Sequence, residues 1–292
     1  MSTAGDSLAG LRRDIAAIVT ADRAADAISA QAQEAERFPL GLAGLDRAIG
    51  GGLRRAALHE VFADKPGDAA AARGFSLALT ACAAFDRPVI WIRQDMIARE
   101  HGELHAPGLM EFGLPPESVV LLRMGDALQT LRAGHEALRC PALGAVVVEL
   151  WGTPRALDLT ASQRLGRAAT KAGVTAFLIR TGMGAAPQPS AALTRWSIRA
   201  APSSLLAADA PGAPVFDISL LLHREGYPPQ TFRMEWNRDD RAFREPALSR
   251  VMVASSGDRP FASPVRENRP PGWNVVPIHG DRHERTGWRK AG

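Results

Sequence analysis

Between residues 57 and 180, short apolar runs alternate with longer stretches in which apolar residues recur every three or four positions. The apolar runs are rich in β-branched residues and have the length of strands, at 57–62, 88–93, 118–123, 144–150 and 174–180. The longer stretches have helical spacing, at 68–85, 95–113, 126–139 and 158–172. Continuous apolar strands between helices predict an α/β fold with a mostly parallel sheet that is covered by helices on both faces.

The pattern changes after residue 180, where three more apolar runs follow without helical stretches between them, at 194–201, 215–223 and 231–237. Between the last two runs lies REGYPPQ (224–230), whose glycine and prolines favour a tight turn. These strands are therefore expected to extend the sheet in antiparallel orientation on its C-terminal side.

The first 36 residues have a helical pattern of a different kind. Leu8, Leu11, Ile15 and Ile18 follow 3-4-3 spacing, which is the apolar seam of a helix that packs on another helix. The seam fades into alanine-rich sequence, so one docking helix is expected rather than a long coiled coil. This helix can bind a partner protein or pack on the protein's own domain, and the pattern leaves both interpretations open.

The last part of the chain, residues 254–292, has the composition of a segment without a packed core. It contains five prolines, few aliphatic residues and interspersed charges. We predict a flexible basic tail in which Trp273 and Trp288 lie among arginines. The expected organisation is a partner helix at 1–36, one α/β domain at 37–253 and a tail at 254–292.

Composition and charge narrow the class of protein. Of 292 residues, 46% are hydrophobic and 23% are charged, as in soluble globular domains. No apolar run has the length of a membrane span, and the N-terminus lacks a secretory pattern, so a cytoplasmic protein is expected. The net charge is +4, of which residues 255–292 carry +3. Because the rest is nearly neutral, any contact with nucleic acid is expected to be local or made by the tail.

Three stretches carry a resemblance to known proteins. FPLGLAGLDRAIGGGLRRAALHEVF (38–62) is similar to the start of the RecA-type core, where a proline-led turn, a G-x-x-x-L-D motif and a glycine-rich turn precede the first core strand. Further along the chain come ELWG (149–152) and SAALTRW (190–196). The combination resembles the family of the inducible mutagenesis protein ImuA, and the resemblance covers about residues 38–240.

The resemblance implies a RecA-like three-layer core and a role in mutagenic translesion synthesis. Members of this family accompany ImuB, a catalytically inactive Y-family polymerase homologue, and an error-prone C-family DNA polymerase. The set is induced in the bacterial SOS response to DNA damage. The protein is thus expected to be an adaptor for these two partners, with further contacts to RecA through the complex, to single-stranded DNA and to a second copy of itself. No membrane contact is expected.

The first core strand leads into ADKPGDAAAARGF (63–75), where an ATP-binding relative would carry its phosphate loop. A working loop has the pattern G-x-x-x-x-G-K-S/T, in which backbone amides and the lysine bind phosphates and the hydroxyl binds magnesium. Here Lys65 precedes Gly67, and no Gly-Lys-Ser/Thr follows. Pro66 removes an amide donor, while Asp68 adds a negative charge and is expected to cap the next helix. The loop is interpreted as vestigial.

The acidic position at the end of the fourth strand agrees with this interpretation. It is Glu149, and Trp151 follows where a small polar residue would be expected. The candidate for the carboxylate that activates water is Asp95, which also suits a helix start. We therefore expect no catalytic residues, no ATP or other cofactor, and no enzyme activity. In this interpretation the strand–turn–helix frame serves the fold alone.

The segment RTGMGAAPQPSAALTR (180–195) has the strongest functional signal. Gly182 and Gly184 free the backbone, while Arg180 and Arg195 flank the loop. A loop after this strand faces the DNA axis in RecA-like folds, so it is a candidate DNA clasp, although a plain connection fits the same pattern. No metal site is expected, because HGELH (101–105) lacks a third ligand and the spacing of zinc motifs.

Three functions remain in competition. The missing Gly-Lys-Ser/Thr favours a non-enzymatic adaptor over an ATP-dependent RecA paralogue with an atypical loop. The sequence does not separate the adaptor from a cell-division inhibitor like SulA, which is built on the same core without ATP.

Overall fold

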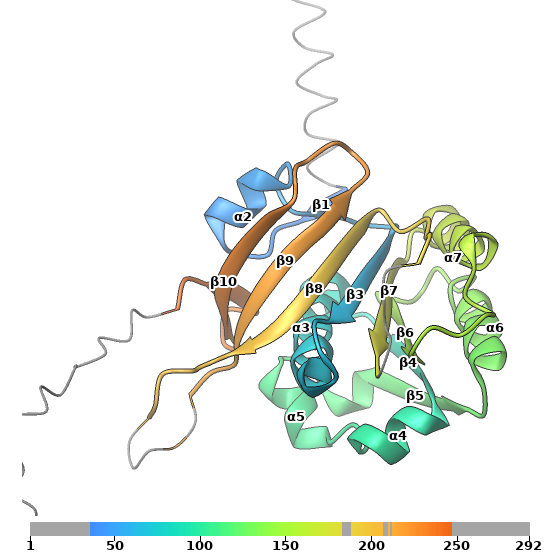
Figure 1. Ribbon diagram of the computed structural model, residues 1–292, viewed down its shortest axis with the longest axis horizontal. Coiled ribbons are helices and arrows are strands. Elements are labelled where there is room, and N and C mark those ends of the chain that lie inside the picture. Colours follow the sequence, from blue (N-terminus) through green and yellow to red (C-terminus); the bar gives the residue numbers. More distant parts are fainter. Residues whose placement is uncertain (1–35, 183–187, 207–209, 211, 247–292) are drawn as a thin grey trace, which may run out of the picture. The chain divides into compact units, whose positions relative to one another are not determined.

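The computed structural model describes residues 36–182, 188–206, 210 and 212–246. Within them, one nine-stranded sheet has the order β11-β10-β9-β8-β3-β7-β6-β4-β5 (Figure 1). Its strands are β3 (Leu58–Ala63), β4 (Val89–Gln94), β5 (Val119–Met124), β6 (Ala145–Trp151), β7 (Thr175–Thr181), β8 (Thr194–Ala201), β9 (Val215–His223), β10 (Gln230–Asn237) and β11 (Ala242–Arg244). A separate antiparallel pair is formed by β1 (Arg37–Phe38) and β2 (Leu53–Arg54).

The sheet is parallel from β5 to β8 and antiparallel from β8 to β11. This arrangement confirms the predicted fold class, a mostly parallel sheet with antiparallel C-terminal strands. The change of direction falls one strand later than expected, because β8 pairs in parallel with β3. The chain first returns from the end of β7 to the start of β3, where the Leu193 amide donates to the Leu58 carbonyl at 2.7 Å.

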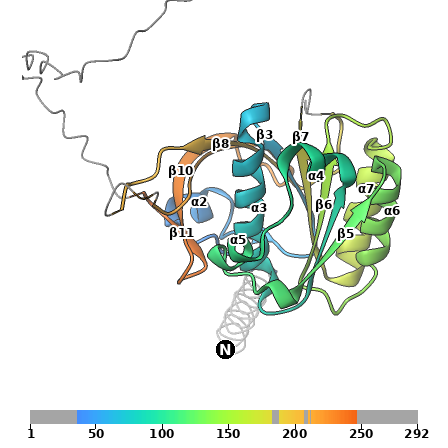
Figure 2. The same cartoon turned by 90° about the horizontal axis from the view of Figure 1, so that it is seen from below.

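Helices cover both faces of the sheet, as Figure 2 shows. One face carries α2 (Ala43–Ala48), α3 (Ala69–Ala84) and α5 (Ala106–Glu111). The other carries α6 (Ala127–Ala137) and α7 (Leu159–Ala172), which lie side by side. The core accordingly has two buried apolar clusters, one on each face.

The helix α3 is enclosed on all sides. Every residue of α3 except Ala70 is buried, as expected for a helix that is apolar around its whole circumference. Phe75, near its middle, packs against Trp196, Phe216 and Phe243, with ring centroids 5.5–6.2 Å apart. In Figure 2 the end of the sheet that contains β8 and β10 curves around this helix. The first turn of α3 therefore has a fixed position beside the carboxyl ends of the parallel strands.

The helix predicted at 95–113 is interrupted. It consists of α4 (Asp95–His101) and α5, separated by Gly102, whose φ of +74° belongs to the left-handed region. Glycine adopts this conformation without steric cost, so it ends α4 and redirects the chain toward α3. The other three predicted helices are present as α3, α6 and α7.

No helix in the described parts of the chain is long and apolar enough to cross a bilayer. Two predicted features lie outside the described residues. One is the tail at 254–292. The other is the partner helix at 1–36, of which residues 1–35, with the seam of Leu8, Leu11, Ile15 and Ile18, are outside the described part.

Candidate functional site

The connection between β3 and α3 occupies the position of a phosphate loop, but two of its backbone amides are already bonded to carbonyls of the protein. The Asp64 amide donates to the Ile198 carbonyl at 2.9 Å, and the Asp68 amide donates to the Lys65 carbonyl at 2.9 Å. Pro66–Asp68 form a single 3-10 turn, in which Gly67 does not adopt a positive φ. A phosphate loop needs free amides that point at its ligand. In this connection one amide is bonded to β8 and another to the connection's own carbonyl.

Asp68 stands at the N-cap position of α3, but it does not cap that helix with its side chain. Its buried carboxylate accepts from the Ala200 amide near the end of β8, at 2.9 Å. The prediction of a side-chain cap is therefore wrong. The short 3-10 turn already provides hydrogen bonds before α3, which leaves the Asp68 side chain free to join α3 to the neighbouring strand.

Glu149 lies fully buried on β6 and is surrounded by cations and donors. Its Oε1 accepts from Arg73 Nε of α3 at 2.9 Å, and its Oε2 accepts from Trp91 Nε1 of β4 at 3.1 Å. Arg93 Nε lies 3.4 Å from the same Oε2. These four residues form the Glu149 network. An acidic residue that would position magnesium and water in an ATPase is here enclosed by two guanidinium groups.

The Glu149 network extends toward the surface through Gly102 and Glu103, which follow α4. Arg93 is fully buried; its Nη1 donates to the Gly102 carbonyl at 3.0 Å and lies 3.5 Å from the carboxylate of Glu103. Burial lowers the pKa of the Arg93 guanidinium, while Glu149 opposes this shift. Burial also lowers the pKa of His101, followed by the effect of nearby Arg73. The charges around Glu149 are therefore mainly balanced within the protein.

Trp151 and Gly182 close the carboxyl end of β6 and β7. The Trp151 amide donates to Gln94 Oε1 at 3.3 Å, and its ring lies 5.1 Å from the His101 ring. Gly182 has a φ of +90°, and a Cβ at this position would lie 2.7 Å from the Trp151 ring. The unusual tryptophan of the acidic motif thus packs directly on the first glycine of the predicted DNA loop.

The arginines that flank the predicted DNA loop bind one buried carboxylate. Glu60 of β3 accepts from Arg195 Nε at 2.8 Å and from Arg180 Nη1 at 3.4 Å. Both guanidinium groups lie over the Phe62 ring, at 5.1 Å for Arg195 and 5.2 Å for Arg180. Arg180 is fully buried, so its guanidinium is not presented to a ligand at the surface. Gly184 lies outside the described residues, and the DNA clasp stays a prediction.

Sequence reasoning missed the buried carboxylate of Glu60, and it missed the three partners of Glu149, which are Arg73, Arg93 and Trp91. A signal was present, because Glu60 and Arg93 each interrupt an apolar strand. A charge within a buried strand requires an opposite charge nearby, and each of these residues has one. The pattern does not tell which partner is chosen, since that depends on strand order.

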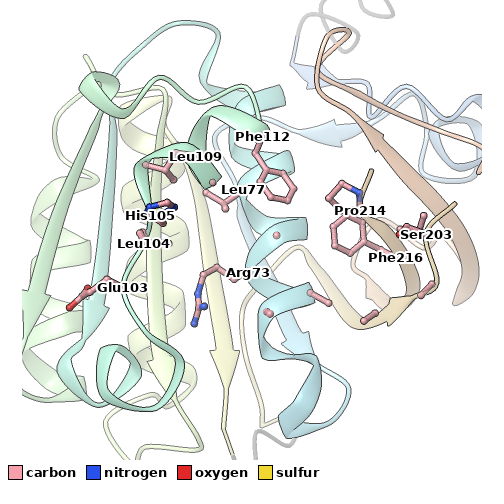
Figure 3. Close-up of a pocket in the computed structure, with 17 residues that line it drawn as sticks. Arg73, Leu77, Glu103, Leu104, His105, Leu109, Phe112, Ser203, Pro214 and Phe216 are labelled. Atoms are coloured by element: carbon pink, nitrogen blue, oxygen red, sulfur yellow. The ribbon is translucent and has the colours of Figure 1, made fainter. Parts of the chain in front are cut away.

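A groove of about 430 Å³ opens beside the Glu149 network, between α3, α5 and the start of β9 (Figure 3). Its lining is mainly apolar, with Leu77, Leu109, Phe112 and Phe216. Figure 3 shows the Arg73 guanidinium directed away from the two phenylalanine rings. An apolar lining of this kind suits an apolar side chain of a partner better than the phosphates of a nucleotide.

Comparison with known proteins shows the family to which this chain belongs. No family model matches the chain. Two curated relatives, each named Protein ImuA and each from a strain of Caulobacter vibrioides, are 31% identical to it over 183 residues. The match covers 59% of this chain and 68% of each relative. On this similarity, the chain belongs to the ImuA family.

Proposed function

We propose that this protein is a non-enzymatic accessory protein of translesion DNA synthesis in the SOS response to DNA damage. Its role is that of an adaptor between an ImuB-type Y-family polymerase homologue and an error-prone C-family DNA polymerase, in the cytoplasm. Membership of the ImuA family supports the link to induced mutagenesis. The motifs ELWG and SAALTRW support the same link at the level of sequence.

One observation carries the non-enzymatic part of the proposal: the Glu149 network. The carboxylate that an ATPase would use for magnesium is held by Arg73, Arg93 and the Trp91 indole. A metal ion at Glu149 would have to displace two buried arginines. Arg73 would then lack its counter-charge, and Arg93 would keep only the half-exposed Glu103. Because the preceding loop also offers few free amides, this site supports a scaffold better than a nucleotide-driven machine.

The adaptor part of the proposal depends on surfaces that can hold partner proteins. The helix expected at 1–36 and the basic tail expected at 254–292 are the proposed contact segments. The apolar groove beside α3 is a third surface of suitable chemistry, because it can accept an apolar side chain.

A nucleotide-binding experiment tests the non-enzymatic part. The purified full-length chain is expected to show no magnesium-dependent ATP turnover and no change in melting temperature with millimolar ATP. The Lys65→Ala variant is the matched control, because Lys65 is the one lysine of the vestigial loop. Stabilisation by ATP that disappears in this variant would show a working site and favour the ATP-dependent RecA paralogue.

A pull-down from DNA-damaged cells tests the adaptor part. We expect the full-length protein to recover the Y-family polymerase homologue, and a variant without residues 1–36 to recover less of it. Recovery of the cell-division GTPase in its place would overturn the adaptor proposal and favour a SulA-like inhibitor.

A further inference from the structure

The helices α6 and α7 lie side by side on the face of the sheet opposite α3 (Figure 2). Three hollows of about 580, 620 and 550 Å³ follow the pair. The first and second share His135 and Arg164 in their lining, and the second and third share Arg167 and Lys171. We call this track the α6–α7 groove.

Basic side chains line the α6–α7 groove along its length. They are exposed and come from α6, the turn after it, α7 and, at the far end, β2: Arg132, Arg139, Arg164, Arg167, Lys171 and Arg54. On α7 the three cations follow i, i+3, i+7 spacing, which places them on one stripe of the helix. Within the described residues, the ion pairs at this groove involve Arg139, His135 and Arg54, whereas the α7 stripe has none.

The acidic residues around the groove do not neutralise this stripe. Glu136 pairs with Arg139 at 3.0 Å. Asp158 caps α7, where its carboxylate accepts from the Ala161 amide at 2.6 Å. No acidic residue occurs within α7 itself. The groove is therefore a local concentration of positive charge on a domain whose net charge is small.

We propose that the α6–α7 groove binds the phosphate backbone of a nucleic acid. The stripe from Arg164 to Lys171 spans seven residues, or about 10 Å along the helix axis. One strand of a duplex carries a phosphate about every 3.4 Å, so a linear polyanion can meet all three cations at once. Arginine is suited to this task because its planar guanidinium can bind two phosphate oxygens together.

The rest of the lining favours a nucleic acid over an acidic peptide. None of the described residues that line the three hollows is a phenylalanine, tyrosine or tryptophan, so bases would not be stacked and sequence would not be read. Small residues such as Gly166, Ala168 and Ala172 keep the floor of the groove accessible to a sugar–phosphate backbone. A peptide would also need an apolar anchor, and exposed Leu128 at one end is the main candidate.

This site differs from the predicted clasp at 180–195, whose arginines bind Glu60, and from the tail. It also stands independently of the adaptor role, because backbone binding needs no partner protein. The proposal adds a sequence-independent nucleic-acid surface on the face of the sheet opposite α3.

Fluorescence anisotropy with labelled single-stranded and duplex oligonucleotides of mixed sequence tests the proposal. The full-length triple variant Arg164→Gln, Arg167→Gln, Lys171→Gln is expected to bind about tenfold more weakly at low salt than the unsubstituted chain. Its slope of log affinity against log salt should be shallower by about two to three, because each lost phosphate contact releases about one counterion fewer. The tail is present in both proteins, so the difference reports on the groove.

A second triple variant, Arg47→Gln, Arg99→Gln, Arg238→Gln, removes the same charge from exposed positions away from the groove. It is expected to keep affinity within about twofold, since it spares the phosphate contacts. Circular dichroism verifies that both variants are folded. Equal loss in both variants would reduce the effect to net charge and overturn the proposal. So would unchanged binding by the groove variant, or a groove that binds polyglutamate but neither oligonucleotide.

Discussion

At the scale of single residues, the protonation state of His59 is controlled by its burial and its two hydrogen bonds. It is fully buried on β3, with Nε2 2.8 Å from the Arg54 carbonyl and Nδ1 2.7 Å from Thr194 Oγ1. A carbonyl only accepts, so Nε2 carries the proton and Nδ1 accepts from the Thr194 hydroxyl. That hydroxyl oxygen also accepts from Trp196 Nε1 at 2.7 Å. Burial, with no room for a second proton, lowers the pKa of His59 to about 4.

This lowered pKa predicts a loss of stability in mild acid. The unfolded chain binds a proton at His59 below its ordinary pKa of 6.5, whereas the folded protein does so only below about 4. The contribution of neutral His59 to the free energy of unfolding is fully present above pH 6.5. It falls by about 3 kcal/mol as the pH decreases to 4. Urea unfolding between pH 7 and pH 4 measures it.

The His59→Gln variant is the control for this prediction, because glutamine does not titrate. Half-buried His101 and buried His223 also have lowered pKa values and contribute to the pH dependence of stability with the same sign, so the comparison isolates His59. The variant should be less stable at pH 7 but should lose about 3 kcal/mol less on acidification. Identical slopes in the two proteins would contradict the assignment.

At the scale of elements, the Glu149 network joins α3, β4 and β6. The Glu149→Gln substitution keeps the shape of the side chain but leaves buried Arg73 without a counter-charge and buried Arg93 with only the half-exposed Glu103. We expect it to lower the free energy of unfolding by about 3–5 kcal/mol, measured by urea denaturation. Glu103→Gln is the matched control, since this carboxylate is half exposed and its loss should cost less than about 1 kcal/mol. Equal effects would show that the network is not the tie between these elements.

Two helical glycines give a second prediction at this scale. A Cβ at Gly134 of α6 would lie 2.6 Å from Val148 Cγ2 of β6, whereas at Gly166 of α7 the nearest atom is Leu58 Cβ at 3.9 Å. Gly134→Ala should therefore destabilise the protein by about 1–3 kcal/mol, because it forces α6 away from the sheet. Gly166→Ala should stabilise it by up to about 1 kcal/mol, because alanine is the better helix former. Thermal unfolding of both variants measures the contrast, and a stabilised Gly134→Ala would contradict it.

Sequence periodicity was sufficient for β3 to β10, because each has a mainly apolar run of strand length. It missed the short strands β1, β2 and β11. Predicted runs such as 88–93 and 215–223 differ from β4 and β9 by at most one residue at each end. Periodicity failed to predict where a helix ends when one backbone angle sets that end, and it failed to predict strand direction when the partner strand is distant in sequence. Gly102 divides one predicted helix into α4 and α5, and the position of β8 depends on its parallel pairing with β3.

The candidate site was less predictable for a related physical reason. The absence of a Gly-Lys-Ser/Thr motif is a local property, so the vestigial loop could be identified from the sequence. Arg180 and Arg195 were interpreted as a flexible clasp, because nothing in the local sequence reveals that both reach Glu60 on the strand between them. A side chain's partner across a sheet depends on strand order, which periodicity does not specify.

At the scale of the whole molecule, positive charge is concentrated in one segment of the sequence. Removing residues 254–292 lowers the net charge from +4 to +1. We expect this truncation to leave the melting temperature unchanged and to weaken binding to partner or single-stranded DNA, most strongly at low salt. Calorimetry and anisotropy measure the two effects. A melting temperature several degrees lower would show that the tail packs on the domain, and the prediction of a flexible tail would be wrong.

Two hydrogen bonds that join α3 to the sheet have a consequence for the motion of this helix. The start of this helix is held to β8 through Asp68 and Ala200, and its second turn to β6 through Arg73 and Glu149. Any shift of the first two turns of α3 would break one of these two hydrogen bonds. The amide hydrogens of α3 should accordingly exchange with deuterium only through global unfolding, and at the same rate with and without ATP. In this protein α3 is therefore a fixed element that is bonded to the sheet at both β8 and β6.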